Sequence, residues 1–397
     1  MWSNLRKFGM GYCDLPTMIW NVSVLLRLLT LNIDSRHTKR APVLLTVMVV
    51  VIISLYFYVY LVSMVWFVFW RCRQTGDVIA AMIVFSLGIA SEIGTAKMFF
   101  MFLYRFILFN MLHILYLPGD AMVEPGSRYA NNILQRLRFV KKRAILFWIT
   151  IIGNGVVYIS KPIVTPGRHI MEDLFIYLGL EPMFESPNYE IAFMVTVAGV
   201  FQTCYPAANI TAFFIVITGY AEAQMLALGE ELNCLWDDAN LQFIERHQEV
   251  PDLDIEKDKV VNEYVKEKLD KIVKTHIRNI LLYQQVETVF RGVIAAEFLL
   301  LIISLIAELL GAMMQVAMDC LTGQRLLDAS YVFKTAVYNC KWENFDKSNM
   351  KTVLLMLQMS QKEMKLSAGG ITTLSFECLM SVIRSIYSAY TTLRTTL

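Results

Sequence analysis

Long stretches of apolar side chains recur along the chain and alternate with polar segments. A bilayer core about 30 Å thick needs about 20 apolar residues in a helix that rises about 1.5 Å per residue. The stretches that approach or exceed this length are residues 43–69, 78–104, 144–160, 191–221, 292–318 and 367–393. The pattern therefore predicts a bundle of membrane-spanning helices.

The composition supports this interpretation. Hydrophobic residues make up 56% of the 397 residues and charged residues 18%, against roughly 45–50% and 25% in a typical soluble domain. So much apolar surface predicts an all-α integral membrane protein in contact with lipid. The 36 basic and 34 acidic residues nearly cancel, so no basic face points to a nucleic-acid partner.

Basic residues are shared unequally between the connecting segments. Residues 118–143 are strongly basic, whereas residues 161–190 carry more acidic than basic side chains. Because short loops rich in Lys and Arg stay in the cytoplasm, we expect the amino terminus and 118–143 inside the cell and 161–190 outside.

The region after the fifth stretch conflicts with a count of six spans. Residues 319–366 would then lie outside, although they are rich in lysine. A cytoplasmic position requires a sixth crossing before them and a seventh after them, yet residues 293–327 are too few for two full crossings. Either one span is short or partial, or this chain lacks part of a helix.

Residues 222–290 are dense in charges of both signs. Apolar residues recur there at helical spacing, namely Val260, Val261, Tyr264, Val265, Leu269, Ile272, Val273 and Ile277. Two interpretations stay open: a plain solvated helix, or a cytoplasmic helical anchor that packs against other subunits.

No enzyme chemistry is visible in the sequence. The five histidines lie far apart, without the spacing of metal ligands, and there is no glycine-rich phosphate loop, HExxH or GxSxG motif. We expect no catalytic residues, no cofactor and no metal.

Charges inside predicted spans need partners, because each costs about 2.5–3.5 kcal/mol at mid-bilayer. Glu92 and Lys97 share the second stretch and could neutralise each other. Glu377 and Arg384 share one face of the last stretch, which is rich in Ser and Thr. That helix is expected either to line a water-filled path or to form interhelical hydrogen bonds.

The carboxy-terminal third resembles the insect odorant receptor family. The matching motifs, in the family's order and spacing, are Ala336-x-Tyr338-x-x-x-Trp342, Gln361-Lys362-x-x-x-Leu366-Ser367-Ala368-Gly369, Leu374-Ser375-Phe376-Glu377 and Tyr387-Ser388-Ala389-Tyr390-Thr391-Thr392-Leu393-Arg394. Glu363 stands where the family usually has proline, and Ala389 where an aromatic residue is common. The match is specific over 331–397 and loose elsewhere.

The resemblance implies the ligand-binding subunit of an odorant-gated, non-selective cation channel. It implies a seven-transmembrane helix bundle with the amino terminus inside and the sixth span possibly truncated. Four subunits, including a shared co-receptor, would surround one pore, and the cytoplasmic helices would form a common anchor. Residues 222–290 are too short for the long loop of the co-receptor itself, which favours an odorant-tuning subunit.

The resemblance also implies where the protein is located and which segments of the chain cross the membrane. We expect a multi-pass protein in the plasma membrane of olfactory sensory neuron dendrites. The expected parts are a cytoplasmic amino-terminal segment (1–42), spans one to four (43–221), the anchor (222–290), shortened spans five and six (291–327), a cytoplasmic segment (328–366) and a pore-lining seventh span (367–397).

Site residues follow from the same resemblance. Gly369 and Gly370 would break the final helix. The pore-lining residues would be Ala389, Thr392, Leu393 and Thr396. A small, volatile, apolar odorant would contact Met82, Phe85, Tyr158, Phe193, Met194, Val197 and Phe201.

The alternatives are other seven-span chemoreceptors. A gustatory-type channel would end in a T-Y-x-x-x-x-x-Q-F motif, which is absent. A G-protein-coupled receptor would carry an E/DRY-type triad after span three and NPxxY in span seven. The last span instead reads Arg384-Ser385-Ile386-Tyr387.

Overall fold

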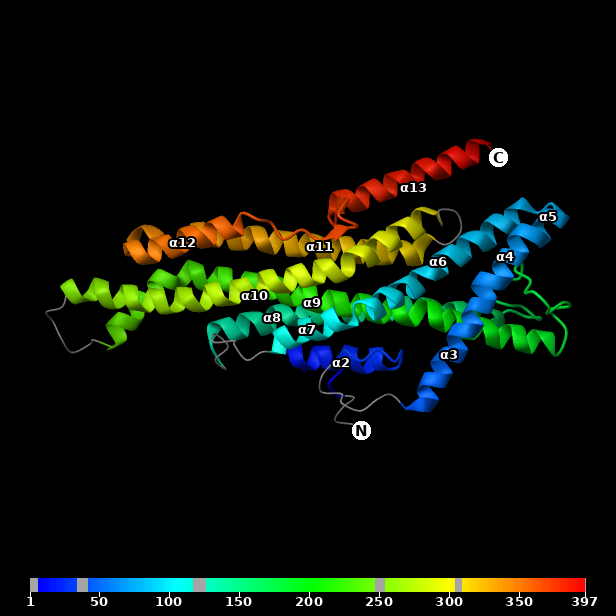
Figure 1. Cartoon of the computed structure of the whole chain (residues 1–397), viewed down its shortest axis with the longest axis horizontal. Helices are drawn as coiled ribbons and strands as arrows, with labels where there is room; N and C mark the ends of the chain where they lie inside the picture. Colours follow the sequence, from blue (N-terminus) through cyan, green and yellow to red (C-terminus); the bar gives the residue numbers. More distant parts are fainter. Residues whose placement is uncertain (1–5, 34–41, 117–125, 247–253, 304–308, 397) are drawn as a thin grey trace.

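The computed structural model of the chain describes residues 6–33, 42–116, 126–246, 254–303 and 309–396. They form an elongated bundle of helices with one small β-hairpin (Figure 1). The elements are α2 (Leu15–Arg27), α3 (Val43–Phe57), η1 (Tyr58–Ser63), α4 (Met64–Trp66), η2 (Phe67–Arg71), α5 (Cys72–Thr75), α6 (Val78–Leu103), α7 (Arg105–Tyr116), α8 (Arg128–Val164), α9 (Asn188–Arg246), α10 (Asp254–Ile303), α11 (Leu309–Tyr338), η3 (Trp342–Asn344), α12 (Lys347–Ser360), β1 (Ser367–Ala368), β2 (Thr372–Thr373) and α13 (Phe376–Thr396).

Four helices among the described residues are long and apolar enough to cross a membrane. They are Val43–Thr75, Val78–Leu103, Arg128–Val164 and Asn188–Glu245, which are the first four predicted spans. The first is a continuous helix in which π-helical turns, η1 and η2, interrupt the α-helical hydrogen bonding.

The long helix α9 is the centre of the bundle. It packs against α2, α3, α6, α8, α10 and α11, and its middle turns are almost completely buried. A helix that is apolar on all sides belongs in such a position. Gly94 permits the close approach of α6, because a Cβ atom there would lie only 2.5 Å from the carbonyl oxygen of Thr203 on α9.

The predicted anchor continues the spans without a break. Helix α9 extends from the fourth span into the residues predicted to form the anchor, and α10 returns from them into the fifth apolar stretch. Of the apolar residues at helical spacing, Val261, Val265, Leu269 and Ile272 are buried. Val260, Tyr264 and Val273 are half-buried, and Ile277 is exposed. We call the end of the bundle that contains α12 the inner end, and the opposite end, which contains α5, the outer end (Figure 1).

The fifth apolar stretch, 292–318, is not a single span. Helix α10 ends at Ile303, and α11 starts at Leu309 and runs back beside it. Both helices end short of the outer end that α5 and α9 reach (Figure 1). Because α10 and α11 run in opposite directions, residues 319–366 return to the inner end. This resolves the conflict between their basic charge and the number of crossings counted from the sequence.

The last helix starts later than predicted. Residues 367–373 form the antiparallel hairpin β1–β2, and α13 starts only at Phe376. Gly369 and Gly370 occupy the turn with φ of 65° and 76°, a region that glycine enters without steric cost. The glycines therefore precede the final helix and do not break it.

An amphipathic helix, α2, lies within the amino-terminal segment, where no helix was predicted. Asp14 caps it by accepting a hydrogen bond from the backbone N–H of Thr17 at 3.0 Å, as expected for an N-cap aspartate. Its apolar face, which includes Met18, Ile19 and Leu26, is buried. Helix α2 packs against α9.

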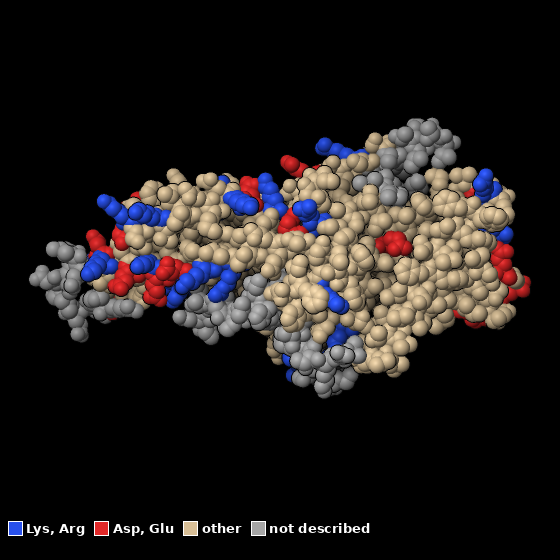
Figure 2. All heavy atoms as spheres, in the orientation of Figure 1, with Lys and Arg blue, Asp and Glu red and all other residues tan. Residues whose placement is uncertain are grey.

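Charged side chains are distributed as a membrane protein requires. Figure 2 shows them gathered over the inner end and at the outer tip, with a broad face between that is nearly free of charge. Exposed apolar residues such as Phe99, Val157 and Met194 lie on the membrane-crossing helices α6, α8 and α9. Lipid is the environment in which such a face is stable.

Candidate functional site

A separate hydrophobic core lies at the outer end of the bundle, which we call the outer cluster. It brings together the first span, α6, the start of α9 and the connection between α8 and α9. Its buried members are Tyr56, Val59, Tyr60, Met64, Phe67, Cys72, Ala80, Val84, Leu87, Ile170, Met171, Phe175, Tyr177, Met183, Ala192 and Val195. Phe175 meets Phe67 and Tyr177 edge-on, with ring centroids 5.6 and 4.8 Å apart.

Two tyrosine hydroxyls in the outer cluster are hydrogen-bonded to neighbouring hydroxyl groups. Thr196 donates to the carbonyl of Ala192, so the hydroxyl of Tyr177, 2.6 Å from Thr196 Oγ1, is the donor of that pair. Tyr56 lies 3.2 Å from Ser91 Oγ in the same way. Burial raises the pKa of Tyr177 above its usual value, which keeps it a neutral donor. The cluster is thus apolar with a few fixed polar atoms, the general character of a small-molecule site.

The connection between α8 and α9 covers the outer cluster. Tyr58 on η1 donates to the carbonyl of Leu178 at 2.7 Å, and Ser63 accepts from the backbone N–H of Leu178 at 3.3 Å. At the edge, Arg71 and Glu181 form an ion pair at 3.3 Å. These contacts hold the connection against the first span.

The predicted ligand residues occupy different surroundings. Tyr158, Phe193 and Val197 pack against the outer cluster, whereas Met82 and Phe85 lie half-buried on α6. Two further predicted residues on α9 face outwards, since Met194 is 65% and Phe201 40% exposed. The outer cluster also contains tyrosines of the first span and aromatic residues of 170–183, which the prediction did not include. The aromatic content of both segments was the available signal.

A buried group of charges joins four helices near the middle of the bundle. Lys97 Nζ on α6 lies 2.8 Å from Glu297 Oε2 on α10 and 3.9 Å from Asp319 Oδ2 on α11. It also donates to Thr211 Oγ1 on α9 at 2.7 Å. The expected pairing of Lys97 with Glu92 is therefore wrong. The carboxylates that reach Lys97 come from α10 and α11 instead.

The predicted pore residues lie on α13, but the side chains of Ala389, Thr392, Leu393 and Thr396 lie outside what the structure describes. In the first half of α13, Cys378 is buried and α11 is the packing partner. Glu377 and Arg384 are exposed. The helix projects from the bundle in Figure 1, and apolar residues such as Phe376 and Met380 are exposed on it as well.

The hairpin before α13 is tied to α10. Ser367 donates from its backbone N–H to Glu287 Oε2 at 2.9 Å, and its hydroxyl also contacts that carboxylate. The backbone N–H of Gly369 donates to the carbonyl of Arg291 at 2.9 Å. Movement of α10 would therefore be transmitted directly to the start of α13.

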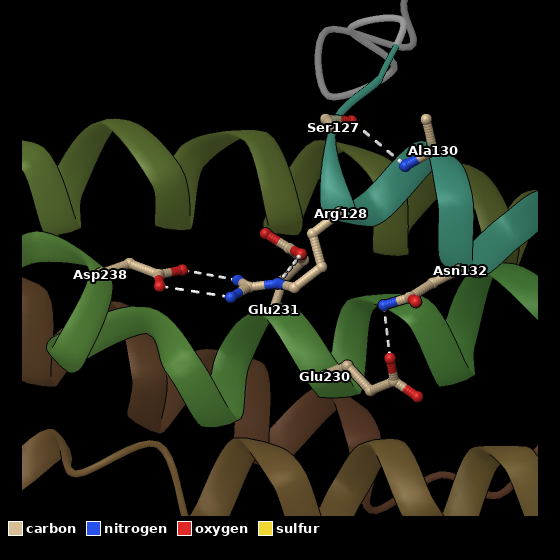
Figure 3. Close-up of polar contacts among 7 residues, drawn as sticks. All are labelled: Ser127, Arg128, Ala130, Asn132, Glu230, Glu231 and Asp238. Carbon is tan, nitrogen blue, oxygen red and sulfur yellow. Dashed lines mark hydrogen bonds and ion pairs between the residues drawn. The ribbon is translucent and has the colours of Figure 1, made fainter.

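Ion pairs fix the inner ends of α8 and α9 to each other. The guanidinium of Arg128, at the start of α8, lies 2.8 Å from Glu231 and 2.5 Å from Asp238 (Figure 3). Asn132 bonds to Glu230 one turn further on (Figure 3).

Comparison with known proteins agrees with this architecture. The family described as 7tm Odorant receptor matches residues 74–309 and 301–387. The chain is 24% identical to Odorant receptor 10 of Aedes albopictus over 289 residues, which is 66% of this chain and 71% of that protein. It is 30% identical to Odorant receptor 85b of Drosophila melanogaster over 95 residues, 24% of each chain.

Solved structures resemble the whole chain. The insect olfactory receptor OR5 from Machilis hrabei superposes with a TM-score of 0.76 at 13% identity, covering 96% of this chain and 98% of that one. Its complex with eugenol gives 0.75 at 12% identity, covering 96% and 99%. At this identity the likeness shows the fold, a seven-transmembrane helix bundle. Because the family match covers most of the sequence, this multi-pass membrane protein belongs to the insect odorant receptor family.

Proposed function

We propose that this chain is the ligand-binding subunit of a heteromeric, odorant-gated, non-selective cation channel. A co-receptor subunit completes the heterotetramer, in the plasma membrane of olfactory sensory neuron dendrites. Family membership supports the receptor role. The observation that carries the channel role is α13, a helix rich in Ser and Thr that packs against α11 and leaves Glu377 and Arg384 exposed.

The odorant site in this proposal is the outer cluster. Tyr158, Phe193 and Val197 contact the ligand, and the Tyr177–Thr196 pair offers a polar group to it. Met194 and Phe201 are left out because they face outwards. A solved structure similar to this chain is described as a complex with eugenol, which supports a small volatile molecule as the class of ligand.

The binding energy expected for such a ligand is modest. Burying about 200 Å² of apolar ligand surface gives roughly 5 kcal/mol at ~25 cal/mol/Å², a dissociation constant on the order of 0.1 mM. A hydrogen bond to Tyr177 or Thr196 would tighten it. Binding would then depend chiefly on shape, and helix shifts at the cluster would favour the open pore.

In the proposed channel, Ala389, Thr392, Leu393 and Thr396 line the pore. These positions recur at the helical spacing that places them on one face of α13. If four copies of this chain surrounded the pore, the polar side chain of Thr392 would make a poor barrier to ions in the closed state. That supports a pore shared with a different subunit.

The test is electrical recording from cells that express this chain with and without the co-receptor. We expect odour-evoked cation current from the pair and little from either chain alone under an odour panel that excludes co-receptor agonists. Robust current from this chain alone would contradict the proposed heteromer. An epitope tag on the amino terminus should stay unstained on intact cells, whereas staining would favour the orientation of a G-protein-coupled receptor.

A further inference from the structure

A cavity lies away from the outer cluster, between α2, α8 and α9. It has a volume of about 270 Å³, close to the lower end for small-molecule sites of roughly 300–1,000 Å³. Its walls include Met18 and Val22 of α2, Ala144 and Trp148 of α8, and Ala212 of α9. Ile149, which also lines it, is 55% exposed, and this marks where the cavity opens to the surroundings of the bundle.

The polar groups around this cavity are occupied, with one exception. Lys141 Nζ donates to the backbone carbonyls of Lys7, Gly9 and Tyr12, so its charge is used to hold the amino-terminal segment. Trp148 Nε1 donates to Asn209 Oδ1 at 3.0 Å. The indole therefore presents only its apolar ring, and nothing in the wall selects an anion.

The exception is the carboxamide of Asn21. This residue lines the cavity and is only 7% exposed. Its Nδ2 donates to the carbonyl of Lys7 at 2.9 Å, which fixes the orientation of the amide. Its Oδ1 is buried and has no hydrogen-bond partner in the described part of the chain. An unpaired buried acceptor costs about 1–3 kcal/mol, and a neutral donor would remove that cost.

We infer that this cavity is a second ligand site, for a neutral aliphatic molecule that carries one hydroxyl group. The apolar walls would bury its chain, and its hydroxyl would donate to Asn21 Oδ1, which is buried in this structure and would be reached by a rotation of the Asn21 side chain towards the ligand. The volume suits a medium-chain alcohol. The site is built from other residues than the outer cluster and lies nearer the inner end, so it does not depend on the proposed odorant site.

The experiment is photolabelling of the full-length chain in phospholipid nanodiscs with a decan-1-ol that carries a diazirine. We expect labelled peptides from α2 and α8. Unlabelled decan-1-ol should compete at least fivefold better than decane, which lacks the hydroxyl. A diacylglycerol, which has one free hydroxyl, tests a lipid source of the same chemistry. Stronger competition than decan-1-ol assigns the site to lipid, and weaker competition assigns it to the free alcohol.

Variants separate cavity binding from surface partition. Ala144→Phe on α8 and Ala212→Phe on α9 fill the cavity, so each should abolish labelling. The control is Leu146→Phe, which adds the same ring to α8 at a position that is 64% exposed and should leave labelling intact. Asn21→Leu should abolish the preference for decan-1-ol over decane, whereas Asn240→Leu in the anchor should preserve it. Equal competition by decane in the unaltered chain, or labelling that survives both phenylalanines, would overturn the inference. Neither result would affect the odour-evoked current.

Discussion

Lys97 on α6 and Glu297 on α10 form a buried ion pair, with 2.8 Å between Nζ and Oε2. The side chains are 3% and 1% exposed. With Asp319 nearby, one cation faces two carboxylates. Thr211 on α9 also accepts a hydrogen bond from Lys97. The arrangement therefore fixes α10 and α11 to α6 and α9, the second and fourth spans.

Removing Lys97 should destabilise the bundle more than removing the charge of Glu297. Lys97→Met leaves two buried carboxylates without a cation, whereas Glu297→Gln leaves Lys97 facing Asp319. Breaking a buried pair costs about 3–5 kcal/mol, so we expect a clear fall in the thermal midpoint of the Lys97→Met protein, measured by fluorescence-detected size exclusion.

The exposed pair of Lys271 and Glu267, also 2.8 Å apart, is the matched control. Lys271→Met should cost only about 0.3–0.5 kcal/mol, as exposed i,i+4 pairs do. An unchanged midpoint for Lys97→Met would show that the buried charges do not hold these helices together.

Acid should weaken the anchor through His276. This residue is 3% exposed and stacks on Phe333 of α11 with ring centroids 4.3 Å apart, and burial lowers its pKa to about 4. The unfolded chain, with a pKa near 6.5, binds a proton before the folded one does. Stability is therefore complete above about pH 6.5 and is lost as the pH falls towards 4, by about 3 kcal/mol in total.

The measurement is the thermal midpoint of the purified chain at a series of pH values. His276→Phe should flatten its decline between pH 6.5 and 4. His169→Gln, at an exposed histidine paired with Asp173, should keep the decline. If the His276→Phe protein lost stability as steeply as the unaltered chain, other groups would govern the acid sensitivity.

Odour sensitivity should separate two neighbouring residues of α9. Phe193 packs against the outer cluster, whereas Met194 is 65% exposed. We expect Phe193→Ala to raise the half-maximal odour concentration by tenfold or more, since burial of an aromatic ring contributes at least 1.4 kcal/mol. Met194→Ala should leave it within twofold in the same recordings, and the reverse order would place the ligand on the other face of α9.

The turn of the hairpin should reject a side chain at Gly370. Its φ of 76° costs a non-glycine residue about 1–2 kcal/mol, and an added Cβ would also meet the guanidinium of Arg291 at 3.3 Å. Gly370→Ala should therefore lower the thermal midpoint. Gly153→Ala, within α8 and facing open space, should leave it unchanged or slightly raised.

Local properties of the chain were predictable from sequence. The helix over 254–303 follows from the spacing of its apolar residues, and the structure buries Val261, Val265, Leu269 and Ile272 but leaves Ile277 exposed. The last motifs of the chain identified the family for the same reason, since they are continuous in sequence. The helix α2 was also locally encoded, by Asp14 and an apolar spacing, but it is too short to register as a span.

The partners of buried groups could not be predicted in this way. Glu92 is near Lys97 in sequence, yet the carboxylates that reach Lys97 come from α10 and α11. Likewise, hydropathy merged the ends of α10 and α11 into one stretch, because it measures composition and not the direction of the chain.

The sequence by itself determined that this is a helical membrane receptor, which segments are apolar and where charge forbids lipid, because hydrophobic length and motif spacing are properties of neighbouring residues. Only the tertiary structure decided that Phe193 and Met194 face different surroundings, that Lys97 meets Glu297, and that Asn21 lines a cavity. Those outcomes depend on how distant helices pack, and packing selects partners by shape and by the need to pair every buried charge.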